Sequence, residues 1–566
     1  MGITAGDGPT ERAATRTAEA ISGQSVVQWS AGTAGMLVPF NIDPGCVVLE
    51  IGVGNGDLTQ ALAERGALVN ALEADADAAQ QAGRRSAGLE LVQVEHLTFS
   101  AWLKSRGSTK RSFDLILYRE DQTSSGQGTA DLELVVEAAT GLLRPSGTLL
   151  LAIGNPWGLR AMLGSFASDS GSSRAMLQAL LNRHGFTEQR WLLPYPDSRA
   201  PAVIVDTELL ARPIGTSLTE MLVRHPVAAP NVGDLFVTDP LKAFQSAVRA
   251  GLAADVADVF LISATRHGQV DDVTRNGRMW LVPPLDISAT WQRPRELLEI
   301  GDRWLFHPLG SYEGISSGPL RLAPVTIEAP AGKSGEDVLV EALIGPGPFA
   351  AVTQGLVRAW WNAARSVIAQ AEPGQHPLDL RPRHFAVDES GDWTYITQDL
   401  SFRFQVPPET LALAAMAHTI VEAVLPRGWM RGLEPSMTVA ESACFLLDTI
   451  GVSCGDEHVM LWLSLEADIR VRIGGSGIDH EASRLVVREF SETTIGSMLD
   501  RLPLAARIAA GVADTRPAAE AEARRSEIAQ LRTARDAAAE GKMRAELESE
   551  RLRGVVSRLR AELGST

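Results

Sequence analysis

The chain contains 566 residues, more than one ordinary hydrophobic core needs, so we expect two or three domains. Its 69 acidic and 52 basic residues give a formal net charge of −17, which excludes a broad electrostatic surface for nucleic acid. Three cysteines are too few for a disulfide scaffold or a cysteine-rich zinc site. Because no apolar run approaches 20 residues and the amino end lacks a signal-peptide pattern, we expect a cytoplasmic protein.

After a polar lead-in over residues 1–40, the segment 41–215 alternates short apolar runs with helix-like stretches. Five of the runs have the composition of buried strands, and they lie at 47–52, 67–73, 89–95, 113–118 and 148–154. The stretch LTQALAERG between the first two runs places Leu58, Ala61 and Leu62 on one helical face. Strands that alternate with helices predict a parallel α/β sheet with right-handed crossovers.

A glycine-rich turn follows the first predicted strand in VVLEIGVGNGDLTQAL. Gly52, Gly54 and Gly56 let the backbone approach a ligand that any Cβ would exclude. Glu73 ends the second strand, where a carboxylate is placed to bind both hydroxyls of a ribose. Asp57 stands where a dinucleotide fingerprint has its last glycine, which argues against that cofactor class. A tight turn whose glycines serve packing alone is the open alternative.

Preceded by an acidic residue, this turn resembles motif I of class I S-adenosylmethionine (SAM) methyltransferases. In that family the acidic residue of the first strand faces the methionine end of SAM. The segments FDLILY and LLRPSGTLLLAI follow in the family's order. The resemblance implies a Rossmann-like sheet over 41–215 and SAM as the cofactor, and we expect no metal. The implied cofactor-binding residues are Glu50, Gly52, Gly54, Asn55, Gly56, Glu73 and Glu95.

Two later segments narrow the resemblance. AIGNPWGLRAMLG (152–164) and HGFTEQRWLLPYPDSRAPAVI (184–204) are similar to stretches of methyltransferases of bacterial surface-polysaccharide assembly. Gly154 replaces an acidic residue of that family, and the segment 197–201 departs from its pattern, so substrate contacts are expected to differ. The run Asn155-Pro156-Trp157 resembles an amine-methylating signature, but it follows the fifth strand and not the fourth, which argues against methylation of nucleic acid.

Oxygen methylation requires a base near the acceptor hydroxyl. Glu120 and Asp121 follow the fourth predicted strand, whose carboxyl end points toward that space, and we predict that one of them is the general base. A solvated acidic pair in a loop is the open alternative. His184 and Asp197 are weaker candidates from the family-like segments.

The segment 216–515 is mixed α and β. In HPLDLRPRHFAVDESGDWTYITQDLSF, Asp379 is followed by His384, a strand-turn-strand pattern and Asp399. This rhythm resembles the catalytic loop and the metal-binding aspartate of kinase-like phosphotransferases. The resemblance implies a kinase-like α+β domain.

Three departures argue against phosphotransfer by this domain. His384 replaces the catalytic-loop asparagine, Ser401 replaces a glycine, and His307 stands where the phosphate-binding lysine is expected. We therefore predict a degenerate kinase-like domain without ATP turnover that serves as a scaffold or glycan-binding unit. An unrelated α/β domain is the alternative.

The tail, residues 516–566, is rich in Ala, Arg, Glu and Leu and has no aromatic residue. A heptad frame places apolar residues at both of its ends, which predicts a helical coiled coil and self-association or an assembly partner. The basic stretch 551–560 also suits peripheral contact with an anionic membrane at its inner face. A single solvated helix is the alternative.

A methyltransferase, a kinase-like unit and a coiled coil occur in this order in enzymes that cap O-antigen chains, which this chain resembles. The resemblance implies SAM-dependent O-methylation of a sugar in a cell-surface glycan or glycolipid precursor. A non-catalytic scaffold of a polysaccharide-assembly complex is the alternative function.

Overall fold

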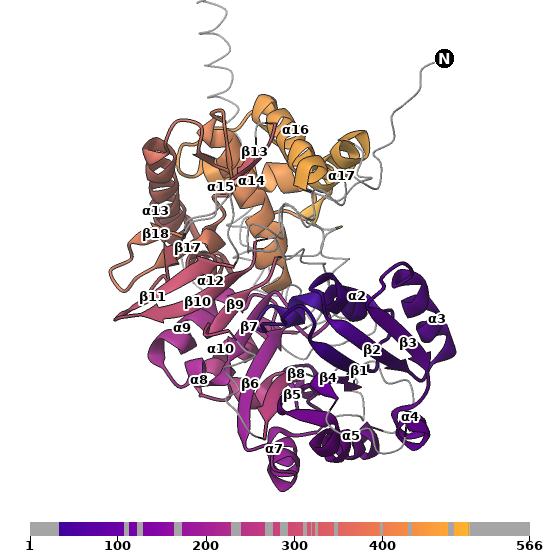
Figure 1. Cartoon of the computed structure of the whole chain (residues 1–566). Coiled ribbons are helices and arrows are strands. Elements are labelled where there is room, and N and C mark those ends of the chain that lie inside the picture. Colours follow the sequence, from indigo (N-terminus) through magenta and orange to yellow (C-terminus); the bar gives the residue numbers. More distant parts are fainter. Residues whose placement is uncertain are drawn as a thin grey trace, which may run out of the picture.

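The fold is described from a computed structural model of the chain (Figure 1). It describes residues 33–497 apart from 107–111, 121–127, 164–171, 228–238, 267–274, 284–292, 310–313, 319, 323–325, 345–348, 397–399, 428–432, 474–479 and 496. The predicted coiled coil of the tail lies outside the described residues. No helix within the described part of the chain is long and apolar enough to cross a membrane.

The first five strands form the parallel half of a large sheet. They are β1 (Val47–Ile51), β2 (Leu68–Glu73), β3 (Val92–His96), β4 (Phe113–Arg119) and β5 (Leu143–Gly154). Neighbours in the sheet run β3-β2-β1-β4-β5, and every adjacent pair is parallel. This order reverses between β1 and β4, as in Rossmann-like sheets. The predicted parallel α/β arrangement is therefore confirmed.

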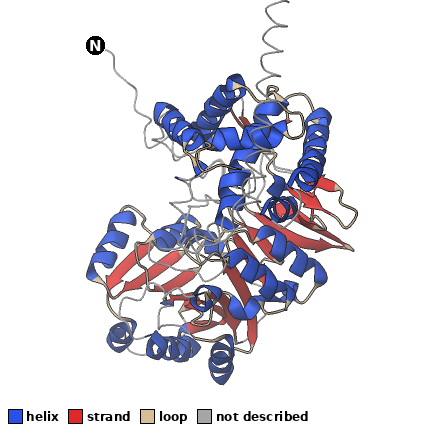
Figure 2. Ribbon diagram, turned by 180° about the vertical axis from the view of Figure 1, so that it is seen from behind, coloured by secondary structure: helices blue, strands red, loops and turns tan. Residues whose placement is uncertain are grey.

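Helices cover both faces of this half of the sheet, as Figure 2 shows. They include α2 (Asp57–Glu64), α3 (Ala76–Arg85), α4 (Phe99–Arg106), α5 (Gly128–Leu142) and α7 (Arg174–Arg183). Alternate residues of β1 enter different cores: Leu49 packs with the residues of α4 and α5, and Val48 packs with those of α2. Burial on both faces explains why these strands are nearly continuous apolar runs.

Beyond β5 the sheet becomes antiparallel. Strand β8 (Val259–Thr265) lies between β5 and β6 (Glu188–Tyr195) and is antiparallel to both. Because β8 comes after residue 216, strands from both sides of the expected boundary at 215/216 share one sheet and one core. The sheet reaches twelve strands with β7 (Val203–Asp206), β9 (Met279–Leu281), β10 (Arg295–Ile300), β11 (Arg303–Pro308) and β14 (Ile327–Glu328).

Short helices connect the strands of this sheet body, which we define as residues 33–309 together with β14. They are η1 (Thr33–Leu37), α6 (Leu159–Met162), α8 (Thr207–Leu210), α9 (Pro213–Leu222), α10 (Pro240–Arg249) and α11 (Ala253–Val256). A buried ion pair between Arg190 and Asp206, at 2.9 Å, ties β6 to β7.

A second body has its own core, from Leu320 to Ile495. Figure 1 shows its helices in brown to yellow: α12 (Gly335–Ile344), α13 (Phe349–Gln370), α14 (Pro408–Thr419), η6 (Ile420–Val424), η7 (Leu425–Arg427), α15 (Val439–Asp448), α16 (Asp456–Ile473) and α17 (His480–Glu492). Two small sheets complete it: β12 (Ile315–Ser317), β13 (Leu320–Leu322), β16 (His376–Pro377) and β19 (Leu400–Phe402), and β15 (Lys333–Ser334), β17 (Phe385–Val387) and β18 (Trp393–Tyr395). The strand with His307, β11, belongs to the large sheet and not to this body.

Buried charges join the two bodies. Arg224, after α9, donates to both oxygens of Asp337 at 2.7 and 2.8 Å and to Glu336 at 2.6 Å. Gln245 of α10 and Arg427 of η7 also reach Asp337. Burial alone would raise the pKa of Asp337, but Arg224 and Arg427 lower it to about 2. Asp337 is therefore ionised and anchors α12 against the sheet body.

Candidate functional site

The glycine turn, residues 52–56, adopts the backbone conformation that its sequence predicts. Gly52, Gly54 and Gly56 have φ angles of 83°, 60° and 81°, in the left-handed region that favours glycine. A Cβ at Gly56 would lie 2.8 Å from the Cα of Ala82 in α3. The turn therefore needs glycine both for its backbone and for close packing against α3.

Glu73 supports the glycine turn from the end of β2. Its side chain is buried, with 1% exposed, and its Oε2 accepts the Gly54 N–H at 2.8 Å. Its Oε1 accepts the Asp75 N–H at 2.9 Å. A carboxylate oxygen can accept more than one hydrogen bond, so Glu73 has remaining capacity for a ligand hydroxyl. Sequence reasoning located this residue but not its role in holding the turn.

Glu50 lies in β1 directly before the turn and is completely buried. Its Oε2 accepts the Thr59 hydroxyl at 2.7 Å, whereas its Oε1 has no hydrogen-bond partner among the described residues. Burial raises the pKa of Glu50 to about 7, although the Thr59 hydrogen bond and the Arg119 charge lower it. An unpartnered carboxylate oxygen in such a place is suited to a cationic or N–H donor of a ligand.

The remaining predicted cofactor residues lie around the turn. Asn55 is exposed, and its side chain bonds to Asp57, which also forms an ion pair with Arg85. Glu95 is half-buried in β3, where its neighbour His96 pairs with Glu73 across the strands. The structure thus brings the predicted residues of β1, β2 and β3 to one edge of the sheet.

The predicted base follows β4 at the same edge. Tyr118 of β4 pairs with Ile51 of β1, so the residues just after both strands lie at one level. Glu120 is 5% exposed, and Arg119 beside it is also buried. Asp121 lies outside the described residues. Glu120 therefore lies one strand away from the glycine turn, at the sheet edge where the sequence predicts the base.

The turn after β5 contains Asn155. Its Nδ2 donates to the carbonyl oxygens of Asp255 and Ala257 at 2.8 and 2.9 Å, and its Oδ1 accepts the Trp157 N–H at 3.1 Å. Asn155 therefore connects this turn to α11, and its amide is occupied by backbone groups. The Trp157 side chain is 70% exposed at the same edge.

The two weaker base candidates lie at opposite edges of the sheet. Asp197 follows β6, and its Oδ1 accepts the N–H groups of Arg199 and Ala200 at 2.9 and 3.0 Å. His184 follows α7 and precedes β6, so it lies at the amino edge, away from the glycine turn. The structure thus brings Asp197 to the candidate site and not His184.

Sequence reasoning missed one carboxylate at this edge, Asp258. It directly precedes β8, whose first residue, Val259, pairs with Gly154 at the end of β5. The Asp258 Oδ1 accepts the Arg160 N–H at 2.9 Å. No local pattern indicates this position, because β8 reaches the site only by pairing with a strand about one hundred residues earlier.

In the second body, Asp379 is paired within the protein. Arg381 donates to both of its oxygens, and the His384 Nε2 lies 3.2 Å from its Oδ2. Burial would raise the pKa of Asp379, but the charges of Arg381 and His384 hold it well below its ordinary value. The second aspartate of the kinase-like pattern, Asp399, lies outside the described residues.

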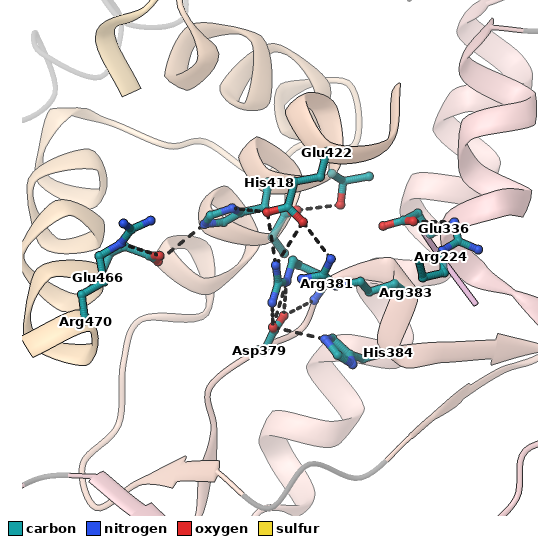
Figure 3. A network of polar contacts seen from close by, with 12 residues as sticks. Arg224, Glu336, Asp379, Arg381, Arg383, His384, His418, Glu422, Glu466 and Arg470 are labelled. Atoms are coloured by element: carbon teal, nitrogen blue, oxygen red, sulfur yellow. Dashed lines mark hydrogen bonds and ion pairs between the residues drawn. The ribbon is translucent and has the colours of Figure 1, made fainter. Parts of the chain in front are cut away.

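Glu422 of η6 extends these pairs into an ion-pair network (Figure 3). It accepts from Arg383 at 2.7 Å and from the Nδ1 of His418 at 3.0 Å. The His418 Nε2 lies 3.5 Å from Glu466 on α16. Burial lowers the pKa of His418, but the two glutamates outweigh it and raise the pKa to about 9. The network therefore connects α14, η6 and α16 to the segment around Asp379.

In the described part of the chain, no cluster of three or more His, Cys, Asp or Glu side chains could hold a metal ion. Comparison with known proteins yields no matching family model and no matching curated protein. Solved structures do match, over less than half of this chain.

Three of these structures are methyltransferases by title. A geranyl diphosphate methyltransferase in complex with SAM is 19% identical, with 46% of this chain and 92% of that chain covered and a TM-score of 0.25. The CcbJ methyltransferase of Streptomyces caelestis is 17% identical (31% and 89% covered, TM-score 0.23). Geranyl diphosphate C-methyltransferase of Streptomyces coelicolor A3(2) is 16% identical (45% and 81% covered, TM-score 0.24).

Proposed function

We propose that the glycine turn binds SAM. The observation that carries the proposal is the buried, unpartnered Oε1 of Glu50 beside a turn of three left-handed glycines. SAM has an ammonium and a sulfonium group, which suit the buried carboxylates of Glu50 and Glu73 beside the turn. The Arg119 charge near Glu50 only partly offsets the effect of burial on that carboxylate. A dinucleotide would instead place its pyrophosphate at this turn, beside Glu50 and Asp57.

The residues of the turn have distinct roles in this proposal. Glu50 accepts from the amino group of SAM, and the glycines leave room for its methionine part. Glu73 accepts from the ribose hydroxyls while it holds the turn through the Gly54 N–H. Glu95 lies in β3, one strand beyond Glu73, on the side where the adenine of SAM would bind. When bound, SAM supplies a methyl group activated for transfer to a nucleophile.

Sheet topology supports the same function. The order β3-β2-β1-β4-β5, followed by the antiparallel β8 and then β6, is the order expected of a class I methyltransferase sheet. We propose a sugar hydroxyl of a cell-surface glycan or glycolipid precursor as the acceptor, on the resemblance of segments 152–164 and 184–204. Glu120 or Asp121 is the base that the sequence favours.

Calorimetry tests the cofactor. SAM and its demethylated product should bind the full chain, and NAD should not. Transfer of labelled methyl groups from SAM to a panel of deoxysugar glycans then tests the acceptor. Failure of SAM to bind would refute the cofactor proposal. Binding without transfer to any glycan of the panel would refute the sugar acceptor and favour the scaffold.

A scaffold role is proposed for the second body, because Asp379 is already paired with Arg381 and His384. A metal ion would have to compete with the Arg381 guanidinium for this carboxylate. ATP-dependent phosphorylation of a glycan, lost in Asp379→Asn, would refute this role.

The tail is proposed to mediate self-association or membrane contact, so a chain that ends at Arg516 should keep its SAM affinity and change its sedimentation or vesicle binding.

A further inference from the structure

Asp258 lies at the edge of the sheet where the proposed reaction takes place. Strand β8 runs antiparallel to β5, so its beginning lies beside the carboxyl ends of β4 and β5. Asp258, just before β8, is two strand positions from Glu120, just after β4. Strand β5 lies between them, and at about 4.8 Å per strand the ends of β4 and β8 are about 10 Å apart.

The surroundings hold the Asp258 carboxylate in one place. Its Oδ1 accepts the Arg160 N–H at the start of α6, and its carbonyl oxygen accepts the Asn155 N–H at 2.8 Å. Gly158 lies so close that a Cβ there would collide with the carboxylate. The side chain is half-buried, so it is held by its neighbours and still open to a bound molecule.

We propose that Asp258 is the group that takes the proton from the acceptor hydroxyl during methyl transfer. This inference rests on the proposed function. The hydroxyl oxygen forms a bond to the methyl carbon, the bond from that carbon to sulfur breaks with its electron pair left on sulfur, and the hydroxyl proton passes to the carboxylate. Glu120, which follows β4, is the other candidate for this role, and the variants below separate the two carboxylates.

Burial is the main cause of the raised pKa of Asp258, and the groups that face it adjust that shift. Burial raises its pKa to about 7; the Arg160 N–H and the Arg160 charge lower it, and Asp197 after β6 raises it. The buried Tyr195 of β6 also faces it, and Asp258 helps to raise the pKa of that phenol. A base is most effective when its pKa is close to the working pH.

The test compares Asp258→Asn with Glu120→Gln in the full chain. Asparagine keeps an oxygen for the Arg160 N–H but cannot take a proton, and Asp258→Glu should restore part of the rate. Asp239→Asn is a matched control, because Asp239 accepts the Leu241 N–H of α10 at 2.9 Å in the same way. SAM affinity is measured by calorimetry, and labelled methyl transfer to the glycan panel is measured from pH 5.5 to 9.

Asp258→Asn should bind SAM within about twofold of wild type and lose transfer by roughly 10²- to 10⁴-fold, with the acidic limb of the pH profile removed. A separate measurement needs no acceptor: the stability of wild type relative to Asp258→Asn should fall as the pH rises toward 7 and then level off. Retained transfer in Asp258→Asn, loss of the acidic limb only in Glu120→Gln, or a pH-independent stability difference would each overturn the inference. Absence of SAM binding by wild type would instead refute the proposed function.

Discussion

The glycine turn of the sheet body and the ion-pair network of the second body both bury carboxylates, but different groups face them. At the turn, Glu50 has one oxygen without a partner among the described residues, and its pKa is raised to about 7. In the network, Asp379 meets Arg381 and His384, and its pKa is held well below its ordinary value.

The direction of the pKa shift therefore separates two uses of a buried carboxylate. A raised pKa marks a group whose burial is not compensated inside the protein, as at sites that await a ligand or a proton. A lowered pKa marks a group whose charge is already matched, as in a structural network. This difference supports the proposals that the glycine turn binds a ligand and that the segment around Asp379 is structural.

The largest effect should come from breaking the network. Arg381→Met leaves Asp379 buried with His384 as its remaining close partner, and removal of one member of a buried pair costs about 3–5 kcal/mol. Urea unfolding measures this loss. The double variant Asp379→Asn/Arg381→Met, which removes both charges, should recover much of it. A loss below about 1 kcal/mol in Arg381→Met would show that the network contributes little.

The pH dependence of stability should reveal Glu50. Because its pKa is raised from 4.5 to about 7, the folded state holds its proton more tightly than the unfolded chain does. Wild type should therefore lose roughly 3 kcal/mol relative to Glu50→Gln as the pH rises from about 4.5 to about 7. Unfolding titrations at several pH values measure the difference, with Glu133→Gln as an exposed control. If the free energy of unfolding changed with pH in the same way in wild type and in Glu50→Gln, burial would not raise the pKa of Glu50 as described.

Removal of Glu73 should have the next largest effect, on SAM affinity. Glu73→Ala removes the acceptor of the Gly54 and Asp75 N–H groups as well as the proposed ribose partner. A charged hydrogen-bond partner contributes about 1.5–3 kcal/mol, so affinity should fall roughly ten- to a hundredfold. Calorimetry measures the SAM affinity of each variant. Glu73→Gln keeps one acceptor oxygen, so its affinity for SAM should fall less than that of Glu73→Ala. Unchanged affinity in Glu73→Ala would remove this strand end from the site.

The smallest effect is expected at an exposed ion pair. Arg488 bonds to Glu492 at 2.8 Å on α17, with both side chains more than 60% exposed. Arg488→Ala should leave the urea-unfolding midpoint close to that of wild type, because solvent screens such pairs. A loss as large as that of Arg381→Met would show that ion pairs stabilise this body regardless of burial.

The local parts of the site were predictable because they depend on short-range rules. A buried strand, three glycines and a helix follow one another between Val47 and Glu64. The left-handed backbone angles at the three glycines follow from that pattern. Glu73 was predictable because consecutive parallel strands end at one edge. The five parallel strands could be predicted because each is a short apolar run in the sequence.

The pairing of strands that are distant in the sequence could not be predicted in this way. The run that forms β8 is apolar and could pack in any core, and only burial against β5 and β6 places it between them and brings Asp258 to the site. The partners of Asp379 show a similar limit: the pattern around it resembles a catalytic loop, but its charge balance depends on how Arg381 folds back onto it and on Glu422, forty-one residues beyond Arg381. Local sequence specifies backbone conformation, whereas the pairing of distant strands and the charge state of a buried group depend on every element that packs around them.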